Sequence, residues 1–194
     1  IVGGAILGYG LLRNQTEAVQ LTLLALASGF LITMVTQSII PEANRAFVAD
    51  RLKCKHDLPL GLDAGEKIEA KGFIIHGVPA AHNTIERDER GKCKFMGFVV
   101  QFGKWCVYHS GDTLWYDHLV ETLKPFRIDV AFLPINGNDP ARGVAGNLNT
   151  KEAAQLGKAI AARLVIPHHY HMFEFNTADP AEFVAAAESL HQPY

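Results

Sequence analysis

The chain has 194 residues, of which 48% are hydrophobic and 20% charged, and its formal net charge is −2. This length suits one ordinary domain, or a smaller domain with an attached segment, and the composition is that of a globular protein with a buried core. The near-neutral charge gives no electrostatic reason to expect nucleic acid as a partner.

The three cysteines, Cys54, Cys93 and Cys106, have no paired spacing. An odd number of cysteines without a Cys-x-x-Cys motif argues against a disulfide framework and fits a reducing compartment. We therefore expect isolated thiols that are buried or half-buried. Cys54 and His56 have a Cys-x-His spacing, but no second half of a zinc finger accompanies them.

Residues 1–43 form an apolar segment in which residues 18–41 carry no charge. An uncharged run of about 20 residues is long enough to span a bilayer. The small residues between positions 25 and 29 would also allow a second helix to approach closely. The segment therefore predicts either a membrane-spanning helix or an apolar helical hairpin that packs elsewhere. The expected location is cytoplasmic, or membrane-associated if residues 1–43 insert.

Part of this segment resembles a known family. Residues 4–13, 24–34 and 39–43 look like late transmembrane segments of a ZIP-type metal transporter. The resemblance covers about a fifth of the chain and lacks the His-rich transport motifs of that family. It implies a membrane protein related to metal transport.

From residue 44 onward the composition becomes that of a folded α/β domain. We expect strands at 67–70, 72–78, 96–102, 105–108, 128–133 and 164–166, and helices at 44–52, 114–125, from Thr150 as N-cap, and from Asp179 to Leu190. Strands and helices alternate in the second half after a mostly β first half. This order predicts an α/β (α+β layered) domain over residues 44–194.

Three residues that can bind metals follow predicted strands: His82, Asp112 and His169. Strand ends on one edge of a sheet hold their loops close together, so we expect these side chains to converge. Imidazole nitrogen and carboxylate oxygen bind borderline divalent metals. Two bridged metals would lower the pKa of a trapped water to about 7 and supply hydroxide. The pattern therefore predicts a hydrolytic metal site.

A long polar loop at 136–149 separates a buried strand from the next helix. Loops of this length in compact domains are usually functional or mobile. Asn136, Asn138 and Arg142 are candidate substrate-binding residues, and Asn147 lies in the same loop. Arg142 could pair with a phosphate or carboxylate of the substrate. The alternative is a solvated loop.

Five motifs together resemble the metallo-β-lactamase-fold hydrolases, and the branch containing L-ascorbate-6-phosphate lactonase looks closest. They are His76-Gly77-Val78-Pro79-Ala80-Ala81-His82-Asn83, Tyr108-His109-Ser110-Gly111-Asp112-Thr113, residues 133–139, residues 146–148, and Ile166-Pro167-His168-His169-Tyr170. The resemblance implies that His82 is the third-motif histidine, Asp112 the bridging aspartate and His169 the last-motif histidine. It further implies the C-terminal half of an αββα sandwich and divalent metal ions, zinc or manganese, two in an intact member.

The chain departs from this family in its first motif. No His-x-His-x-Asp-His string, which holds most of the first metal, occurs in the sequence. His168 and His171 are unusual for the family. Each could be an additional metal ligand, a residue that hydrogen-bonds to a ligand, or a surface histidine. His109 and His118 are expected to be structural or surface histidines. With three ligands we expect weak metal affinity and slight turnover.

The leading hypothesis is a metal-dependent hydrolase acting on a lactone, ester or phosphoester, with Asp112 and His169 as catalytic residues. Its partner would be a small-molecule substrate, with or without a phosphate group. No nucleic acid is expected, and membrane contact could occur through residues 18–41. The oligomeric state stays open. Two alternatives remain: a membrane protein related to metal transport with a metal-binding appendage, and a fusion of gene fragments without catalysis.

Overall fold

The computed structural model describes residues 39–41 and 60–194, except 71, 144–145 and 172–174. The predicted helix at 44–52, Cys54, and residues 1–38 of the apolar segment lie outside these ranges. Within the described residues, no helix is both long and apolar enough to cross a membrane.

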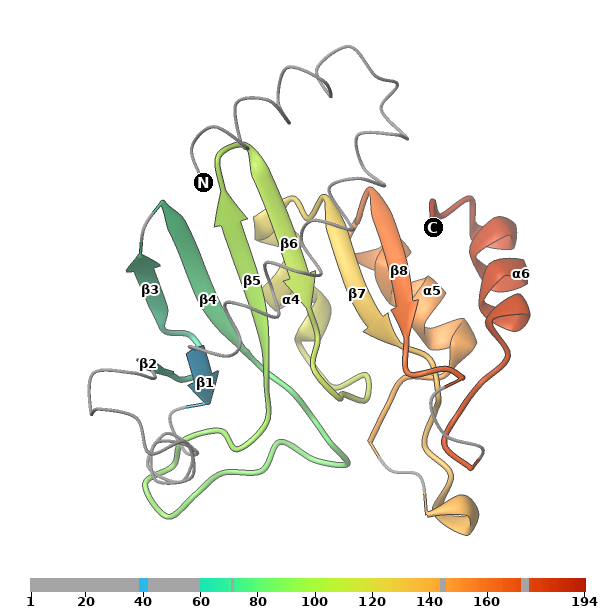
Figure 1. The fold of residues 1–194 in the computed structure, drawn as a ribbon, viewed down its shortest axis with the longest axis horizontal. Helices are drawn as coiled ribbons and strands as arrows, with labels where there is room; N and C mark the ends of the chain where they lie inside the picture. Colours follow the sequence, from blue (N-terminus) through green and yellow to red (C-terminus); the bar gives the residue numbers. More distant parts are fainter. Residues whose placement is uncertain (1–38, 42–59, 71, 144–145, 172–174) are drawn as a thin grey trace.

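A six-stranded sheet forms the centre of the described structure, in the order β3-β4-β5-β6-β7-β8 (Figure 1). Its strands are β3 (Lys67–Ala70), β4 (Phe73–Pro79), β5 (Met96–Phe102), β6 (Trp105–His109), β7 (Val130–Pro134) and β8 (Leu164–His168). Neighbours from β3 to β6 pair antiparallel, whereas β6, β7 and β8 pair parallel. A small parallel pair, β1 (Ile39–Pro41) with β2 (Leu60–Leu62), lies apart from this sheet. The expected mixed α/β class is confirmed.

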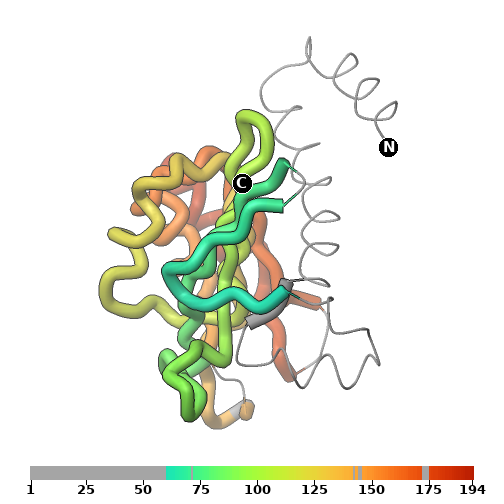
Figure 2. Tube along the Cα trace, turned by 90° about the vertical axis from the view of Figure 1, so that its left-hand side faces the viewer, coloured from blue at the N-terminus to red at the C-terminus, as the bar shows by residue number. Residues whose placement is uncertain are grey.

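Three helices connect or follow the parallel strands and lie on one side of the sheet (Figures 1 and 2). They are α4 (Leu119–Leu123), α5 (Thr150–Ala159) and α6 (Pro180–Leu190). Short 3-10 turns, η2 (Lys124–Phe126) and η3 (Pro140–Arg142), follow α4 and β7. Parallel strands need long crossover connections, which usually contain a helix, and α4 and α5 lie in the connections from β6 to β7 and from β7 to β8.

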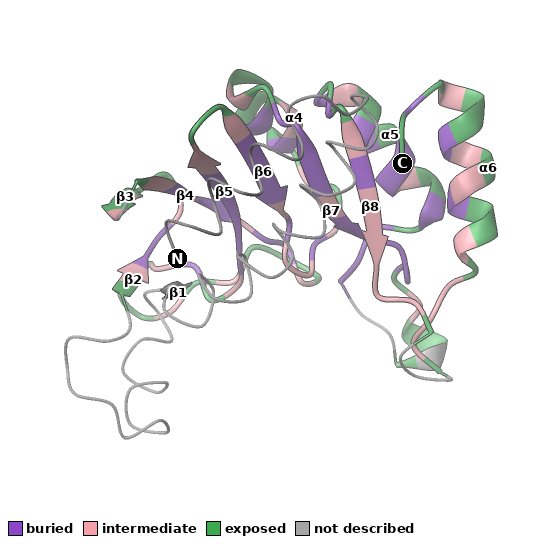
Figure 3. Ribbon diagram, turned by 45° about the horizontal axis from the view of Figure 1, so that its top comes forward, coloured by how far each residue is buried: buried purple, intermediate pink, exposed green. Residues whose placement is uncertain are grey.

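Side chains alternate between the two faces of the sheet, and both faces carry apolar clusters. Much of β5, β6 and β7 is buried (Figure 3). The face toward the helices holds the main core, which includes Tyr108, Leu133 and Val165 from the strands, Leu156 from α5 and Phe183 from α6, all fully buried. The opposite face carries two further apolar clusters, one on β4 and β5 and one on β6 to β8. Cys93 and Cys106 are buried free thiols, as expected.

Two predicted helix starts are wrong, each for a local reason. The helix expected from residue 114 begins only at Leu119, because the segment before it bonds to the end of β4 instead: Leu114 N–H donates to Ala81 O (2.9 Å) and Tyr116 Oη to Pro79 O (2.8 Å). The next helix is capped by Asn149 rather than Thr150. The Asn149 side chain accepts from two backbone N–H groups, and Glu152 completes the capping box.

The cap of the last helix is confirmed. Asp179 accepts a hydrogen bond from the Ala181 N–H (2.9 Å), and Pro180 occupies the first helical position. Strand β8 is longer than expected, reaching His168, so His169 follows the strand directly. His168 is therefore the last residue of β8, and His169 is the first residue after the strand.

Candidate active site

The predicted site residues follow three strands that point the same way. Strand β4 is antiparallel to β5, and β5 to β6, so β4 runs parallel to β6, β7 and β8. The carboxyl ends of these four strands therefore meet at one edge of the sheet. His82 follows β4, Asp112 follows β6 and His169 follows β8.

Asp112 and His169 are in direct contact. His169 Nε2 lies 2.7 Å from Asp112 Oδ1, and the two side chains are 28% and 39% exposed, so the pair remains open to solvent. The backbone of His169 is left-handed, with φ of 63°. Such a conformation costs free energy in a non-glycine residue and is common at functional sites. The turn after β8 thus presents this imidazole to the carboxylate after β6.

The contact changes the proton affinity of both groups. Burial raises the pKa of Asp112, but the hydrogen bond from His169 and the nearby imidazoles of His169, His82 and His168 lower it below the ordinary value overall. The hydrogen bond to Asp112 raises the pKa of His169, against the opposing effect of burial. The pair therefore favours a carboxylate beside an imidazolium when no metal is bound.

Hydrogen bonds between the loops fix this edge of the sheet. The Thr113 hydroxyl accepts from the Ala81 N–H (2.9 Å), and the Thr113 carbonyl accepts from the Leu148 N–H (2.8 Å). The Ile135 N–H donates to the His168 carbonyl (3.1 Å). The segment after β6 is consequently tied both to the segment after β4, which carries His82, and to the loop before α5.

His82 lies between an aromatic ring and a glycine. Its ring contacts Phe95 edge-on, with ring centroids 5.2 Å apart. Its Nδ1 atom is buried and has no hydrogen-bond partner among the residues that the structure describes. Gly146, with φ of 70°, packs so closely that a Cβ atom there would overlap the His82 ring and backbone. Gly146 belongs to the motif at residues 146–148, but nothing in the sequence alone indicated that it contacts His82.

We expect Gly146→Ala to displace His82 and to destabilise the fold by about 2 kcal/mol, because the new methyl group meets backbone as well as side chain. Urea unfolding measures the loss. Gly143→Ala is the matched control, since Gly143 has nearly the same backbone (φ 65°) and open space around its Cα. Equal losses in the two variants would show that the contact with His82 contributes nothing.

A row of imidazoles extends from the Asp112–His169 pair. The His168 ring lies 5.0 Å from the His169 ring and stacks on His109 at 4.9 Å, centroid to centroid. His109 Nδ1 accepts from the Gly111 N–H (3.1 Å). Burial lowers the pKa of His168 to about 3, and burial also lowers that of His109. Both rings are therefore neutral at neutral pH.

The other two histidines considered in the sequence analysis, His171 and His118, are exposed. His171 is exposed and has a left-handed backbone (φ 56°), and its ring contacts Tyr170. His118 is exposed, as expected. His109 was expected to be structural or on the surface, and its place in the imidazole row gave no signal in the sequence because it depends on β6, β7 and β8 being neighbours.

The candidate substrate-binding residues occupy different environments. Asn136 is buried, donates to Asn176 Oδ1 (2.5 Å) and forms an isolated bridge with Asn149. Asn147 is buried, and in the described part of the chain its Oδ1 has no hydrogen-bond partner. Asn138 is exposed. The Arg142 side chain lies outside what the structure describes, so its predicted contact with a substrate anion stays a prediction.

The chemistry of these donors suits a divalent metal, but their number does not complete a site. Imidazole nitrogen and carboxylate oxygen are ordinary ligands of zinc and manganese, and no described residue forms a hydrogen bond with the buried Nδ1 of His82. In the part of the chain that is described, however, no three His, Cys, Asp or Glu side chains are grouped so that they could hold a metal ion. The structure brings together Asp112 and His169, and the assignment of all three ligands stays a prediction.

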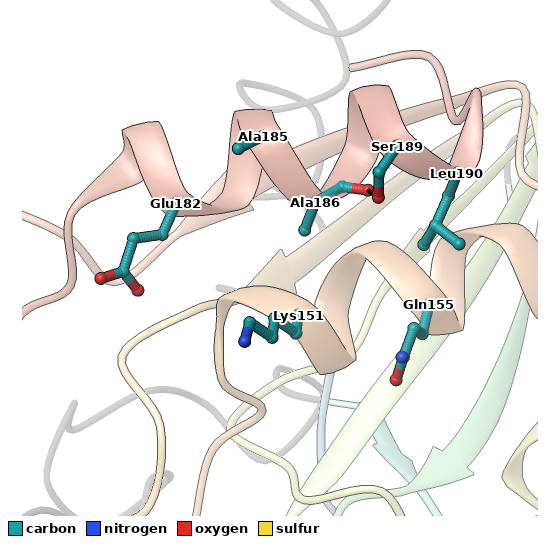
Figure 4. Close-up of a pocket in the computed structure, with 7 residues that line it drawn as sticks. All are labelled: Lys151, Gln155, Glu182, Ala185, Ala186, Ser189 and Leu190. Carbon is teal, nitrogen blue, oxygen red and sulfur yellow. Dashed lines mark hydrogen bonds between the residues drawn. The ribbon is translucent and has the colours of Figure 1, made fainter.

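A pocket lies elsewhere, between α5 and α6 (Figure 4). Its volume is about 550 Å³, and it is lined by Lys151 and Gln155 of α5 and by Glu182, Ala185, Ala186, Ser189 and Leu190 of α6. None of the predicted site residues lines it.

Comparison with known proteins agrees with this arrangement of strands and loops. A model of the beta-lactamase superfamily domain matches residues 21–170. The chain belongs to this family. The match begins inside the apolar segment assigned above to residues 1–43.

Curated relatives in the family are described as UPF0173 metal-dependent hydrolases. The relative from Methanoregula boonei is 35% identical over 131 residues, which cover 66% of this chain and 56% of that protein. The relative from Methanosarcina mazei is 30% identical over 146 residues, covering 73% and 60%. The chain thus spans less than two thirds of the length of either relative.

Solved structures show the same fold. Igni18, a metallo hydrolase from Ignicoccus hospitalis, superposes with a TM-score of 0.60 at 24% identity, over 80% of this chain and 63% of that one. The metallo-beta-lactamase fold protein YhfI from Bacillus subtilis gives 0.59 at 16% identity, over 78% and 57%. The expected metallo-β-lactamase fold is confirmed, whereas neither the lactonase branch nor the ZIP-type resemblance receives support from these comparisons.

Proposed function

We propose that this chain belongs to a metal-dependent hydrolase in which Asp112, His169 and His82 bind divalent metal. The observation that carries the proposal is the 2.7 Å contact between His169 Nε2 and Asp112 Oδ1 at the carboxyl edge of parallel strands. The description of the curated relatives as metal-dependent hydrolases supports it independently.

The residues of the chain prepare this edge for a metal. Asp112 is held as a carboxylate, the form that binds metal, and its half-exposed position leaves a route for ligands. A bound divalent ion would replace the His169 proton at the contact with Asp112, and it would supply an activated water and polarise the substrate. The neutral rings of His168 and His109 add no positive charge that would repel it.

The substrate we propose is a small lactone, ester or phosphoester. All three present an electrophilic carbon or phosphorus that hydroxide attacks, and all three develop negative charge on oxygen that a cation stabilises. Asn147 and Asn138 lie in the loop before α5 and would contribute amide hydrogen bonds to such a substrate, with Arg142 as a candidate for an anionic group.

The test is hydrolysis by the purified chain after metal removal with EDTA and reloading with Zn²⁺ or Mn²⁺. The substrates are a p-nitrophenyl ester, bis-p-nitrophenyl phosphate and a simple lactone. We expect slow turnover of at least one of them that disappears with EDTA and returns with metal. Turnover that is unchanged by EDTA would reject metal dependence, and the absence of both turnover and metal binding would reject the proposal.

A further inference from the structure

Asp112 is carried by a short turn, Ser110-Gly111-Asp112, that begins directly after β6. The Ser110 N–H donates to the Phe132 carbonyl on β7 (3.2 Å), and the Ser110 hydroxyl donates to the Gly111 carbonyl (2.6 Å). Gly111 has a left-handed backbone (φ 63°), and a Cβ atom there would lie 2.5 Å from the Met96 carbonyl oxygen on β5. The turn therefore has little room to move toward β5.

The ring of His109, the last residue of β6, closes this turn. Its Nδ1 atom accepts a hydrogen bond from the Gly111 N–H (3.1 Å). A neutral imidazole that accepts at Nδ1 carries its proton on Nε2, so neither nitrogen has a lone pair left for a metal ion. His109 is consequently suited to hold the turn in place and not to bind the metal itself.

The same ring contacts the segment that carries the other candidate ligand. It stacks on the His168 ring, with centroids 4.9 Å apart and an angle of 25° between the planes. It also stacks on Phe132 of the intervening strand β7 (5.9 Å, 18°). His168 directly precedes His169, and the Ile135 N–H donates to the His168 carbonyl (3.1 Å). His109 thus contacts both the turn after β6 and the end of β8.

These two contacts lie on either side of a short distance in the candidate site. His169 Nε2 and Asp112 Oδ1 are 2.7 Å apart. Side chains that act on one metal ion or substrate must be held to within about 0.5 Å of the productive geometry. Asp112 directly follows Gly111, so loss of the acceptor at His109 would free the Gly111 peptide unit to rotate and would change the direction of the carboxylate.

We propose that His109 is a positioning residue that, by accepting from Gly111 and stacking on His168, sets the place of Asp112 relative to His169. The inference rests on the proposed function, because this placement serves the chemistry only if Asp112 and His169 bind a metal ion. Its geometric part, the hold of His109 on the turn, can be tested without metal.

Two substitutions separate the hydrogen bond from the packing. His109→Phe keeps a ring of similar size for stacking and removes the acceptor. His109→Asn removes the ring, but its Oδ1 atom is bonded to Cγ, as Nδ1 is, and can still accept from the Gly111 N–H. His118→Asn, at an exposed histidine, is the control for loss of an imidazole. Urea unfolding checks that the variants fold.

The first readout is NMR of the metal-free chain. We expect the His109 ring of the unmodified chain to carry its proton on Nε2, and the Gly111 amide to exchange slowly with solvent. Exchange should become about 10-fold faster in His109→Phe, because the amide loses its acceptor, and should stay within about 3-fold in His109→Asn and His118→Asn. A proton on Nδ1, or equal exchange in His109→Phe and the unmodified chain, would overturn the inference.

The second readout is the Zn²⁺ affinity of the same proteins, measured by competition with a chromophoric chelator. We expect His109→Phe to lose about 10- to 100-fold, as for residues that support a metal ligand, and the two Asn variants to lose less than about 3-fold. Equal affinity of His109→Phe and the unmodified chain would overturn the positioning role. If the unmodified chain binds no Zn²⁺, the proposed function is rejected, and the Gly111 exchange still decides whether His109 holds the turn.

Discussion

Asp112→Ala is expected to lower the metal affinity of the purified chain at least about 100-fold, because loss of a supporting residue behind a metal ligand already costs 10 to 100-fold. The variant removes the carboxylate and also the partner of His169 Nε2. Metal-dependent turnover should fall with it. Mass-spectrometric metal analysis after dialysis against limiting Zn²⁺ measures the first effect, and a p-nitrophenyl substrate the second.

Asp117→Ala is the control for this variant. Asp117 is an exposed carboxylate in the same connection between β6 and α4, so its removal changes the net charge equally without touching His169. It should keep the metal content of the unmodified chain. Equal metal content in all three proteins would count against Asp112 as a ligand.

Phe183→Ala is expected to destabilise the fold by about 3 to 5 kcal/mol, the usual cost of truncating a buried aromatic side chain. Phe183 is fully buried in the core between α6, α5 and the sheet, and its ring also contacts Tyr194 edge-on at 6.2 Å. Urea unfolding followed by circular dichroism measures the loss. If the loss is below about 1 kcal/mol, α6 contributes little to holding this core.

Ser189→Ala on the same helix is the matched control. Ser189 is exposed, and its hydroxyl donates to the Ala186 carbonyl within the helix (2.8 Å). Its replacement should change the free energy of unfolding by less than about 0.5 kcal/mol. A large loss at both positions would point to a general sensitivity of α6 rather than to burial of Phe183.

The strands and the last helix were predictable because their signals are local. Asp179 as N-cap and Pro180 at the first helical position predict the start of α6. The apolar residues Leu164, Val165 and Ile166 predict the strand that leads to His168. The start of α4 was not predictable, because its first turn is lost to hydrogen bonds with Ala81 and Pro79, far away in sequence.

In the candidate site, too, features with a local sequence signal were predictable, and features that depend on distant contacts were not. Asp112 and His169 could be named from their motifs, and their contact follows from neighbouring parallel strands. The support of His82 by Gly146 and the stacking of His109 on His168 could not, since both depend on the packing of distant loops and strands. Sequence motifs therefore indicated the candidate ligands, whereas the residues that contact those ligands could be identified only from the three-dimensional structure.

The parallel order β6-β7-β8 also has a kinetic consequence. Val107 pairs with Val130, and Val130 with Leu164, so each pairing closes a long loop that contains a helix. Such non-local pairings are slow compared with hairpins. Asp112 and His169 follow the two outer strands of this trio, so they meet only after both loops have closed. Their contact should form late in folding, and a chain released or cleaved before β8 docks would hold the carboxylate without its histidine.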